Sequence, residues 1–367
     1  MPDLTARPST DRVLAIDWLR GLSVLFMIEC HALRLLEPAR ELDPLWSFLQ
    51  SINGLVAPAF IMVAGFAFGL VSLRSAADPT ERRRRRWRSL RRIGVVFGVA
   101  LLLNFDYLWW EPRHLLHWGI LQTIGMSLLW LWAMFLVLRL PRLAMAIVLP
   151  VLGAGSIFAG PFVQASDWGS FGYLLTNGEF RFIPWGGFAF LGAWIGMFCV
   201  GSHGRRGLYL TLLFVGAVAY AGSQAGPWLE SWYPGGAWEI PNYAHRIVMI
   251  CIVTLGLCLI EEVARRWPAV GHNPITWVLG HYSRYALGAF YFHLNFLYGF
   301  WGLRLTEPIH QSCGWIAYAC GTLALIVATG IAAWGTSKTV RWAMDYWARW
   351  WTTRASAARS PVPTSPG

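Results

Sequence analysis

Four ionisable side chains lie within one hydrophobic segment near the start of the chain: Asp17, Arg20, Glu29 and His31. Arg20 and His31 are separated by close to three helical turns, so they share one face and lie about 16 Å apart along the axis. Asp17 lies within about 40° of that face. Ionisable groups at membrane depth are costly and are functional candidates by default. The spacing indicates a helix that joins a ligand at one membrane surface to chemistry near the other.

These residues also have a structural interpretation. Asp17 and Arg20 could form an ion pair, and His31 could be a buried histidine with satisfied hydrogen bonds. Glu29 points about 200° away from His31, so it must be protonated or paired with a group on another helix. Because all four occur in a single segment, we favour the functional interpretation and assign His31 and Glu29 as catalytic candidates.

A second group of polar residues lies between the third and fourth hydrophobic segments. His114 and His117 are three residues apart and could share a helical face, and Gln122 follows within the next apolar segment. No cysteine or third ligand is near this pair, so the spacing does not predict a metal site. We expect these three residues to bind an acceptor or to lie at the membrane interface.

Arg284 and His293 occupy the ninth hydrophobic segment. They are about half a turn out of phase, so a regular helix does not direct both at one point. Arg284 could serve the cytoplasmic side, whereas His293 could face the interior as a catalytic group or make an interhelical hydrogen bond.

Aromatic and polar residues alternate in the segment 226–243, a pattern that suits a sugar and a membrane belt equally well. Near it and near the segment 161–183, three residues are candidates for acceptor binding: Arg181, Trp185 and His245.

The composition is that of a polytopic membrane protein. Of 367 residues, 56% are hydrophobic and 13% are charged, and the mean hydropathy is +0.45. The 23 tryptophans often lie at segment ends, as interfacial belts require. The net charge of +11 includes an arginine cluster at residues 82–92, which we assign to topology and to contact with anionic lipids rather than to nucleic acid. The six cysteines lack ligand spacing and are read as small core residues.

The hydropathy pattern predicts an all-α bundle of about ten membrane-spanning helices. The predicted spans are 15–36, 54–73, 93–110, 118–138, 143–160, 184–201, 207–225, 244–264, 283–303 and 313–336. Arginines are concentrated in alternate connections, so the positive-inside rule places both termini in the cytoplasm. It places the segments 37–53, 111–117, 161–183, 226–243 and 304–312 outside.

The chain divides into four parts. Residues 1–12 and 355–367 are short and polar or rich in Ser and Pro, so we expect a disordered cytoplasmic N-terminus and a disordered tail. Residues 13–336 form the membrane domain. Residues 337–354 alternate basic and aromatic side chains, as in a helix that lies at the membrane interface.

Five short motifs follow one another along the membrane domain, and each occurs once. They are Asp17-Trp18-Leu19-Arg20-Gly21; Asn53-Gly54 with Ala57-Pro58-Ala59-Phe60 and Gly65; Gly119, Leu121, Gln122, Ile124 and Gly125; Pro184-Trp185-Gly186-Gly187-Phe188 with Leu191, Gly192 and Gly196; and Arg284, Leu287 and His293. Together they resemble, over roughly residues 12–300, the catalytic domain of heparan-α-glucosaminide N-acetyltransferase and its bacterial relatives, within a superfamily of transmembrane acyltransferases.

The chain departs from the family pattern at two places. In the last motif, Ala286 and Phe290 stand where the family has Ser and Tyr. The loop at 32–52 has no histidine, so His31 is a substitute at a shifted position.

The resemblance implies transfer of an acetyl group from cytoplasmic acetyl-CoA to an amine or hydroxyl of a saccharide or glycan on the far side of the membrane. The short termini and the use of arginine over lysine indicate that this is a bacterial inner membrane. Asp17, Arg20 and Arg284 would bind the donor, and His31 or His293 would deprotonate the acceptor or carry the acetyl group. The choice between N- and O-transfer, the choice between direct transfer and an acetyl-histidine, and the oligomeric state stay open.

Two other classes of function compete with this interpretation. A membrane transporter or lipid-linked carrier would need a continuous polar path and usually internal repeats, and the sequence shows no repeat. A haem-bearing electron carrier would need two histidines, such as His31 and His293, facing each other at matched depth.

Overall fold

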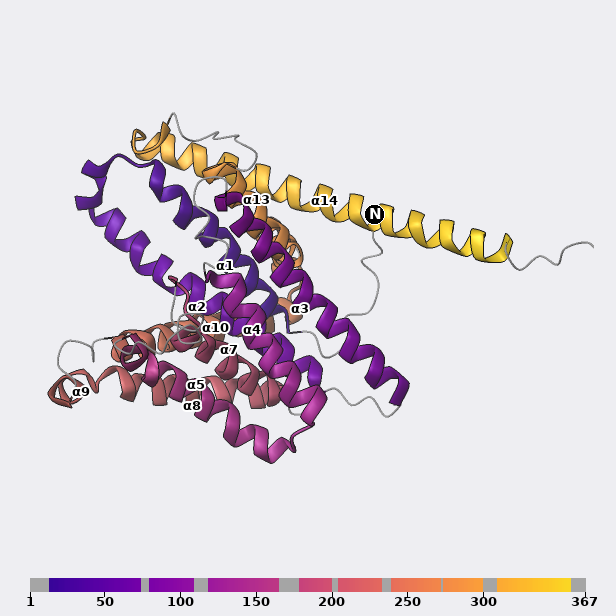
Figure 1. Ribbon diagram of the computed structural model, residues 1–367. Helices are drawn as coiled ribbons and strands as arrows, with labels where there is room; N and C mark the ends of the chain where they lie inside the picture. Colours follow the sequence, from indigo (N-terminus) through magenta and orange to yellow (C-terminus); the bar gives the residue numbers. More distant parts are fainter. Residues whose placement is uncertain are drawn as a thin grey trace, which may run out of the picture.

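The computed structural model describes residues 13–73, 79–108, 118–164, 178–199, 204–232, 239–271, 273–299 and 309–357. In this part of the chain the regular elements are helices (Figure 1), which confirms the predicted all-α fold. They are α1 (Leu14–Ala32), α2 (Pro44–Ser72), α3 (Pro79–Leu108), α4 (Ile120–Trp132), continued by a π-helical segment (Ala133–Leu138), α5 (Arg142–Gln164), α7 (Phe182–Met197), α8 (Gly204–Ser223), α9 (Gly226–Trp232), α10 (Glu239–Arg266), α11 (Pro268–Gly271), α12 (Pro274–Arg284), α13 (Ala286–Tyr298) and α14 (Trp315–Ala357).

Six helices are long and apolar enough to cross a membrane: α2, α4 with its π-helical extension, α5, α8, α10 and α14. The chain is therefore a multi-pass membrane protein. α7 is apolar but shorter. Helices also occupy the described parts of the other predicted spans: α1 with its three charged residues, α3 with its arginine-rich start, and the α12–α13 pair. The total of ten spans and the orientation of the termini stay predictions.

The observed helix boundaries differ from the predicted ones at several spans, including α3, which begins at Pro79 rather than at residue 93. α2 begins at Pro44, ten residues before the predicted span, because Pro44 occupies its first turn and residues 45–53 continue the helix. The ninth span is interrupted at Tyr285, where α12 ends and α13 begins. α14 passes residues 336–337 without a break, since residues 315–357 contain no proline.

Figure 1 shows α14 and the start of α3 extending beyond the rest of the bundle. The predicted interfacial segment 337–354 is the distal part of α14. Of the predicted terminal segments, residues 1–12 and 358–367 lie outside the described residues, and residues 355–357 belong to α14.

The closest helix packing joins α2 to α7 through glycines. A Cβ atom built on Gly65 would lie 2.0 Å from the carbonyl oxygen of Ala189 on α7. In the opposite direction, a Cβ on Gly192 would lie 2.0 Å from the carbonyl oxygen of Met62 on α2. Membrane helices use small residues in this way to bring their backbones into contact. The motif glycines therefore set the distance between two central helices.

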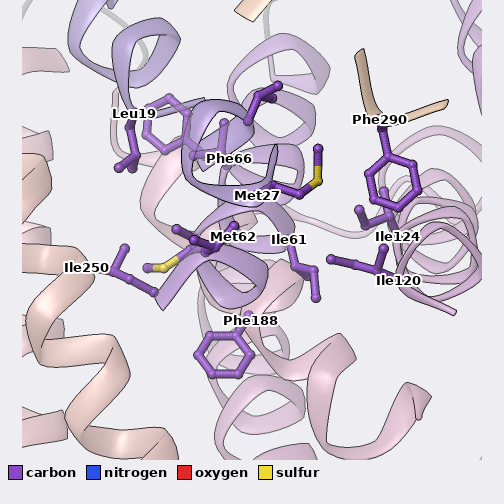
Figure 2. Close-up of a cluster of buried hydrophobic side chains, with 14 of the residues drawn as sticks. Leu19, Met27, Ile61, Met62, Phe66, Ile120, Ile124, Phe188, Ile250 and Phe290 are labelled. Carbon is purple, nitrogen blue, oxygen red and sulfur yellow. The ribbon is translucent and has the colours of Figure 1, made fainter. Parts of the chain in front are cut away.

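An apolar core fills the space between α2, α7 and the surrounding helices. Figure 2 shows this cluster, and its labelled side chains come from α1, α2, α4, α7, α10 and α13. The labelled members are Leu19, Met27, Ile61, Met62, Phe66, Ile120, Ile124, Phe188, Ile250 and Phe290. The apolar packing of these buried side chains holds α1 and α13 against the α2–α7 pair.

Two polar contacts fix the ends of α1. At its first turn, the Ala15 amide donates to Oε2 of Glu261 over 2.9 Å, and Arg205 and Arg265 donate to Oε1 over 2.8 and 2.7 Å. Glu261 is only 2% exposed. A carboxylate at a helix N-terminus is favourable because it satisfies unpaired amides and the helix dipole. Beyond the other end of α1, the Cys313 amide donates to the Leu35 carbonyl over 2.9 Å, which ties this end to the start of α14.

Candidate active site

The structure brings two predicted catalytic histidines together. His31 lies in the last turn of α1 and His293 lies on α13, and their ring centroids are 5.1 Å apart with a 49° angle between planes. Nδ1 of His31 is also 3.1 Å from the hydroxyl of Tyr298. The two rings are in contact, which leaves no slot for a porphyrin between them. The geometry therefore favours proton or acyl transfer over haem ligation.

The tautomer of His293 follows from its surroundings. Its ring is fully buried, and Nδ1 is 2.9 Å from the carbonyl oxygen of Ala289. Because a carbonyl can only accept, Nδ1 must carry the hydrogen in this contact, and Nε2 of the neutral ring keeps its lone pair. No protein group is hydrogen-bonded to Nε2. Nε2 of His293 therefore has a lone pair that can accept a proton, next to the ring of His31.

A cavity of about 530 Å³ opens beside this pair; His31 lines it, whereas the fully buried His293 is not among its lining residues. That volume lies within the usual range of small-molecule sites, roughly 300–1,000 Å³. The walls come from α1, α2, α3, α13, α4 with the preceding Gly119, and residues 179–180, which lie before the Arg181 cap of α7. The lining residues are Met27, Cys30, His31, Asn53, Val56, Ala57, Phe60, Ala100, Leu103, Asn104, Gly119, Ile120, Leu121, Gln122, Glu179, Phe180, Phe290, Leu294 and Tyr298.

The cavity combines apolar walls with a few convergent polar groups, which is the usual pattern of a ligand site. Gln122, a predicted acceptor residue, lines the cavity, and its Oε1 accepts the Gly119 amide over 3.1 Å at the start of α4. Asn53, Asn104 and Glu179 also line it. The sequence analysis did not assign these last three residues to the site. Amides within apolar helices are the signal that could have identified Asn53 and Asn104.

Glu29 does not line the cavity. Its Oε1 accepts a hydrogen bond from the hydroxyl of Tyr318 on α14, which confirms that this carboxyl is paired with another helix. Its Oε2 is buried and lacks a hydrogen bond, and the side chain of Asn53 lies nearby. The structure therefore places Glu29 behind the cavity wall, where it can act only through a neighbouring residue.

The predicted donor residues form a separate polar cluster at the opposite end of α1. Nη1 of Arg20 is 3.4 Å from Oδ1 of Asp17 and 3.5 Å from the hydroxyl of Ser283 on α12. Ser283 in turn lies 3.4 Å from Oδ1 of Asp17. Arg284 is exposed and is not part of these contacts, because it lies one residue further round α12. Ser283, rather than Arg284, joins Asp17 and Arg20.

Close backbone contact brings α12 to this cluster. A Cβ on Gly21 would lie 2.1 Å from the carbonyl oxygen of Leu279 on α12. The glycine that follows Arg20 in the first motif therefore allows α12 to approach α1 and to place Ser283 beside Asp17.

Three other predicted acceptor residues, all of them described, do not reach the cavity lining. Trp185 is buried against Tyr243 of α10, with ring centroids 5.7 Å apart, because its face of α7 turns toward α10. Arg181 caps the start of α7 beside Phe180, and His245 is exposed on α10. None of these three lines the cavity. His114 and His117 lie outside the described residues.

The described helices define a multi-pass membrane protein with an imidazole pair beside a cavity. Residues 12–226 match the family described as "Heparan-alpha-glucosaminide N-acetyltransferase, catalytic". The match covers well over half of the chain, so the protein belongs to that family of membrane acetyltransferases. No curated protein sequence matches the chain. The matched range includes His31, Asn53 and Gln122 but ends before α12 and α13, which carry Ser283 and His293.

Proposed function

We propose that this protein transfers an acetyl group from cytoplasmic acetyl-CoA to a hydroxyl or amine of a saccharide or glycan on the opposite side of the membrane. The observation that carries the proposal is the His31–His293 pair beside a 530 Å³ cavity, in a chain of an acetyltransferase family. A neutral imidazole has one nitrogen lone pair that can accept a proton or attack an acyl carbon, so either ring could act as base or nucleophile.

Charge supports the orientation in this proposal. Arg205 and Arg265 lie with Glu261 at the Asp17 end of α1, and the arginine-rich start of α3 follows the C-terminal end of α2. The positive-inside rule assigns that end to the cytoplasm and the His31 end to the far side.

The donor would bind at the Asp17 end. Coenzyme A carries several phosphate charges, and arginine is the preferred partner of phosphate oxygens. Arg20 would bind a phosphate group there, with Asp17 and Ser283 orienting its guanidinium. The thioester would then extend along α1 toward His31, about 16 Å further on.

In direct transfer, one imidazole lone pair takes the proton from the acceptor hydroxyl or amine. The acceptor oxygen or nitrogen attacks the thioester carbonyl, the C–S bond breaks, and the thiolate of coenzyme A takes the proton back from the imidazolium. In the two-step alternative, one ring nitrogen of His31 attacks the thioester carbonyl, the C–S bond breaks, and the thiolate of coenzyme A takes the proton of the other ring nitrogen and leaves as the thiol. The acceptor then attacks the acetyl-imidazole, the C–N bond to the ring breaks, and the acceptor proton returns to the imidazole. The hydroxyl of Tyr298 orients His31 in both routes.

The apolar core argues against a transporter or carrier. Leu19 and Phe66 belong to the buried cluster between the Asp17 end and the cavity (Figure 2). A transport path would need polar groups at this depth, whereas an acyl chain and pantetheine arm need only space that side-chain motion can provide.

The test is an acetyl-transfer assay with purified protein in detergent and radiolabelled acetyl-CoA. We would measure label on the protein, in free acetate and on a panel of amino sugars and glycans, for wild type, His31→Gln and His293→Gln. His310→Gln is the matched control, since His310 is exposed and lies outside the cavity lining.

The proposal expects transfer by wild type and by the control, and a loss of at least 100-fold in His31→Gln with donor binding retained. A folded wild-type protein that neither binds acetyl-CoA nor transfers its label would overturn the proposal.

A further inference from the structure

Unsatisfied buried polar atoms are concentrated around the His31 end of the bundle. Among the described residues, buried side-chain atoms without a hydrogen bond include Oε2 of Glu29, Nε2 of His293, and both Nδ2 and Oδ1 of Asn53. Native proteins leave few such atoms, and those at a cavity point to a missing partner. The two atoms of Asn53 are the most informative, because they belong to a side chain that lines the cavity itself.

Asn53 is 8% exposed and lies on the cavity-facing side of α2. Leaving a buried amide unpaired costs roughly 1–3 kcal/mol for each polar group. The neighbouring Glu29 carboxyl interacts with the Asn53 side chain, and the hydroxyl of Tyr318 donates to Oε1 of that carboxyl. Glu29 therefore helps to hold Asn53 in the wall, while neither Nδ2 nor Oδ1 of Asn53 makes a hydrogen bond of normal geometry to a described residue.

The rest of the wall indicates what these groups would bind. Asn104 on α3 and Gln122 on α4 add further amides to the same cavity as Asn53. Val56 and Phe60, one and two turns along α2, add apolar surface. Side-chain amides can form hydrogen bonds with the hydroxyl groups of a sugar, and apolar surface can pack against its ring carbons. The wall therefore suits a sugar ring.

The charge of the wall restricts the acceptor further. Among the described lining residues there is no Lys or Arg, and the one acidic side chain is Glu179. A carboxylate at the wall favours a neutral or cationic ligand and opposes a phosphate or uronate.

From these observations we infer that Asn53 is the acceptor-binding amide of this enzyme, and that the cavity selects against an anionic sugar ring. Asn53 donates to one ring substituent through Nδ2 and accepts from another through Oδ1, next to the histidine that acts on the reacting group. This inference rests on the proposed function, and it adds to that proposal the residue that recognises the acceptor and the charge class that it selects.

The experiment compares wild type with Asn53→Leu, which removes both polar groups, and Asn53→Asp, which keeps the shape but removes the donor. Gln224→Leu is the control, since Gln224 is an exposed amide at the end of α8. The probes are glucosamine, methyl glucoside and N-acetylglucosamine as neutral or amine ligands, and glucuronic acid and glucosamine 6-phosphate as anionic ones. Three quantities are measured: acetyl-CoA binding, the acceptor KM, and the shift in melting temperature that each probe produces.

We expect at least one neutral or amine probe to raise the melting temperature of wild type and to serve as acceptor, with the anionic probes at least tenfold weaker. Asn53→Leu should raise the acceptor KM by about 10- to 100-fold while acetyl-CoA binding stays unchanged. Asn53→Asp should show a smaller rise, and it tests the role even where the leucine variant does not fold.

Two results would overturn the inference while leaving the proposed function intact. The first is an acceptor KM that is unchanged in both Asn53 variants of an active enzyme, as expected if the amide binds only water. The second is a wild-type protein that binds acetyl-CoA but responds only to anionic probes, or to none. Failure of wild type to bind acetyl-CoA at all would instead refute the proposed function.

Discussion

The substitution Gly192→Ala tests whether the backbone contact between α2 and α7 holds this bundle together. The added Cβ would lie 2.0 Å from the Met62 carbonyl oxygen, whereas ordinary van der Waals contact begins at 3.4 Å. The obstacle is backbone, so no side-chain rotation can relieve it. The helices must separate by roughly 1 Å or more, which would also loosen the reciprocal contact at Gly65.

The expected magnitude is the difference between two effects. Alanine is favoured over glycine in a helix by roughly 1 kcal/mol. Overpacking a well-filled interior costs roughly 1–3 kcal/mol, and a rigid backbone neighbour places this site at the upper end. We therefore expect Gly192→Ala to lower the free energy of unfolding by about 2 kcal/mol. Acetyl transfer should also fall, because α2 carries Asn53 and the turn before α7 carries Phe180, both of which line the cavity.

The assay is equilibrium unfolding in mixed micelles with a denaturing detergent, followed by the fluorescence of the 23 tryptophans. Gly98→Ala is the matched control, since Gly98 is also helical and a Cβ there meets no atom within 4 Å. The control should be as stable as wild type or up to about 1 kcal/mol more stable. Equal stability of Gly192→Ala and Gly98→Ala would refute the reasoning that close backbone approach limits this interface.

Two further predictions concern the ends of α1. Glu261→Gln removes the charge that holds Arg205 and the first turn of α1, and it should cost about 1–3 kcal/mol in the same unfolding assay. Glu262→Gln, at a more exposed partner of Arg205, should cost less than about 1 kcal/mol, and equal costs would contradict the burial argument. Tyr298→Phe removes the hydroxyl 3.1 Å from His31 and should lower kcat about tenfold with a changed pH profile. An unaltered kcat and pH profile would show that this hydroxyl does not orient the imidazole.

Some elements of the site could be predicted from the sequence because they depend on spacing within a single helix. Asp17 and Arg20 are three residues apart, so their ion pair follows from helical periodicity. Glu29 is turned away from His31 for the same reason, and its need for a partner on another helix follows from the cost of a lone buried carboxyl.

Other elements could not be predicted because they depend on where helices end and which faces meet. The assumption of one regular ninth helix was wrong at Tyr285, where α12 ends and α13 begins, so Arg284 and His293 belong to different helices. Trp185 was predicted to bind the acceptor, but the rotation of α7 turns it toward Tyr243. Helix phase of this kind is set by packing against neighbours, which the local sequence does not encode.

The sequence by itself determined the all-helical fold, the membrane environment and the family, because hydropathy, charge and ordered motifs are properties of the chain alone. The tertiary structure decided which groups meet: His31 with His293, Ser283 with Asp17, and Asn53 with the cavity. The physical reason is that these contacts depend on how closely helices approach and at what depth. The motif glycines permit that close approach. Which neighbouring helix lies against each glycine is seen only in the packed bundle.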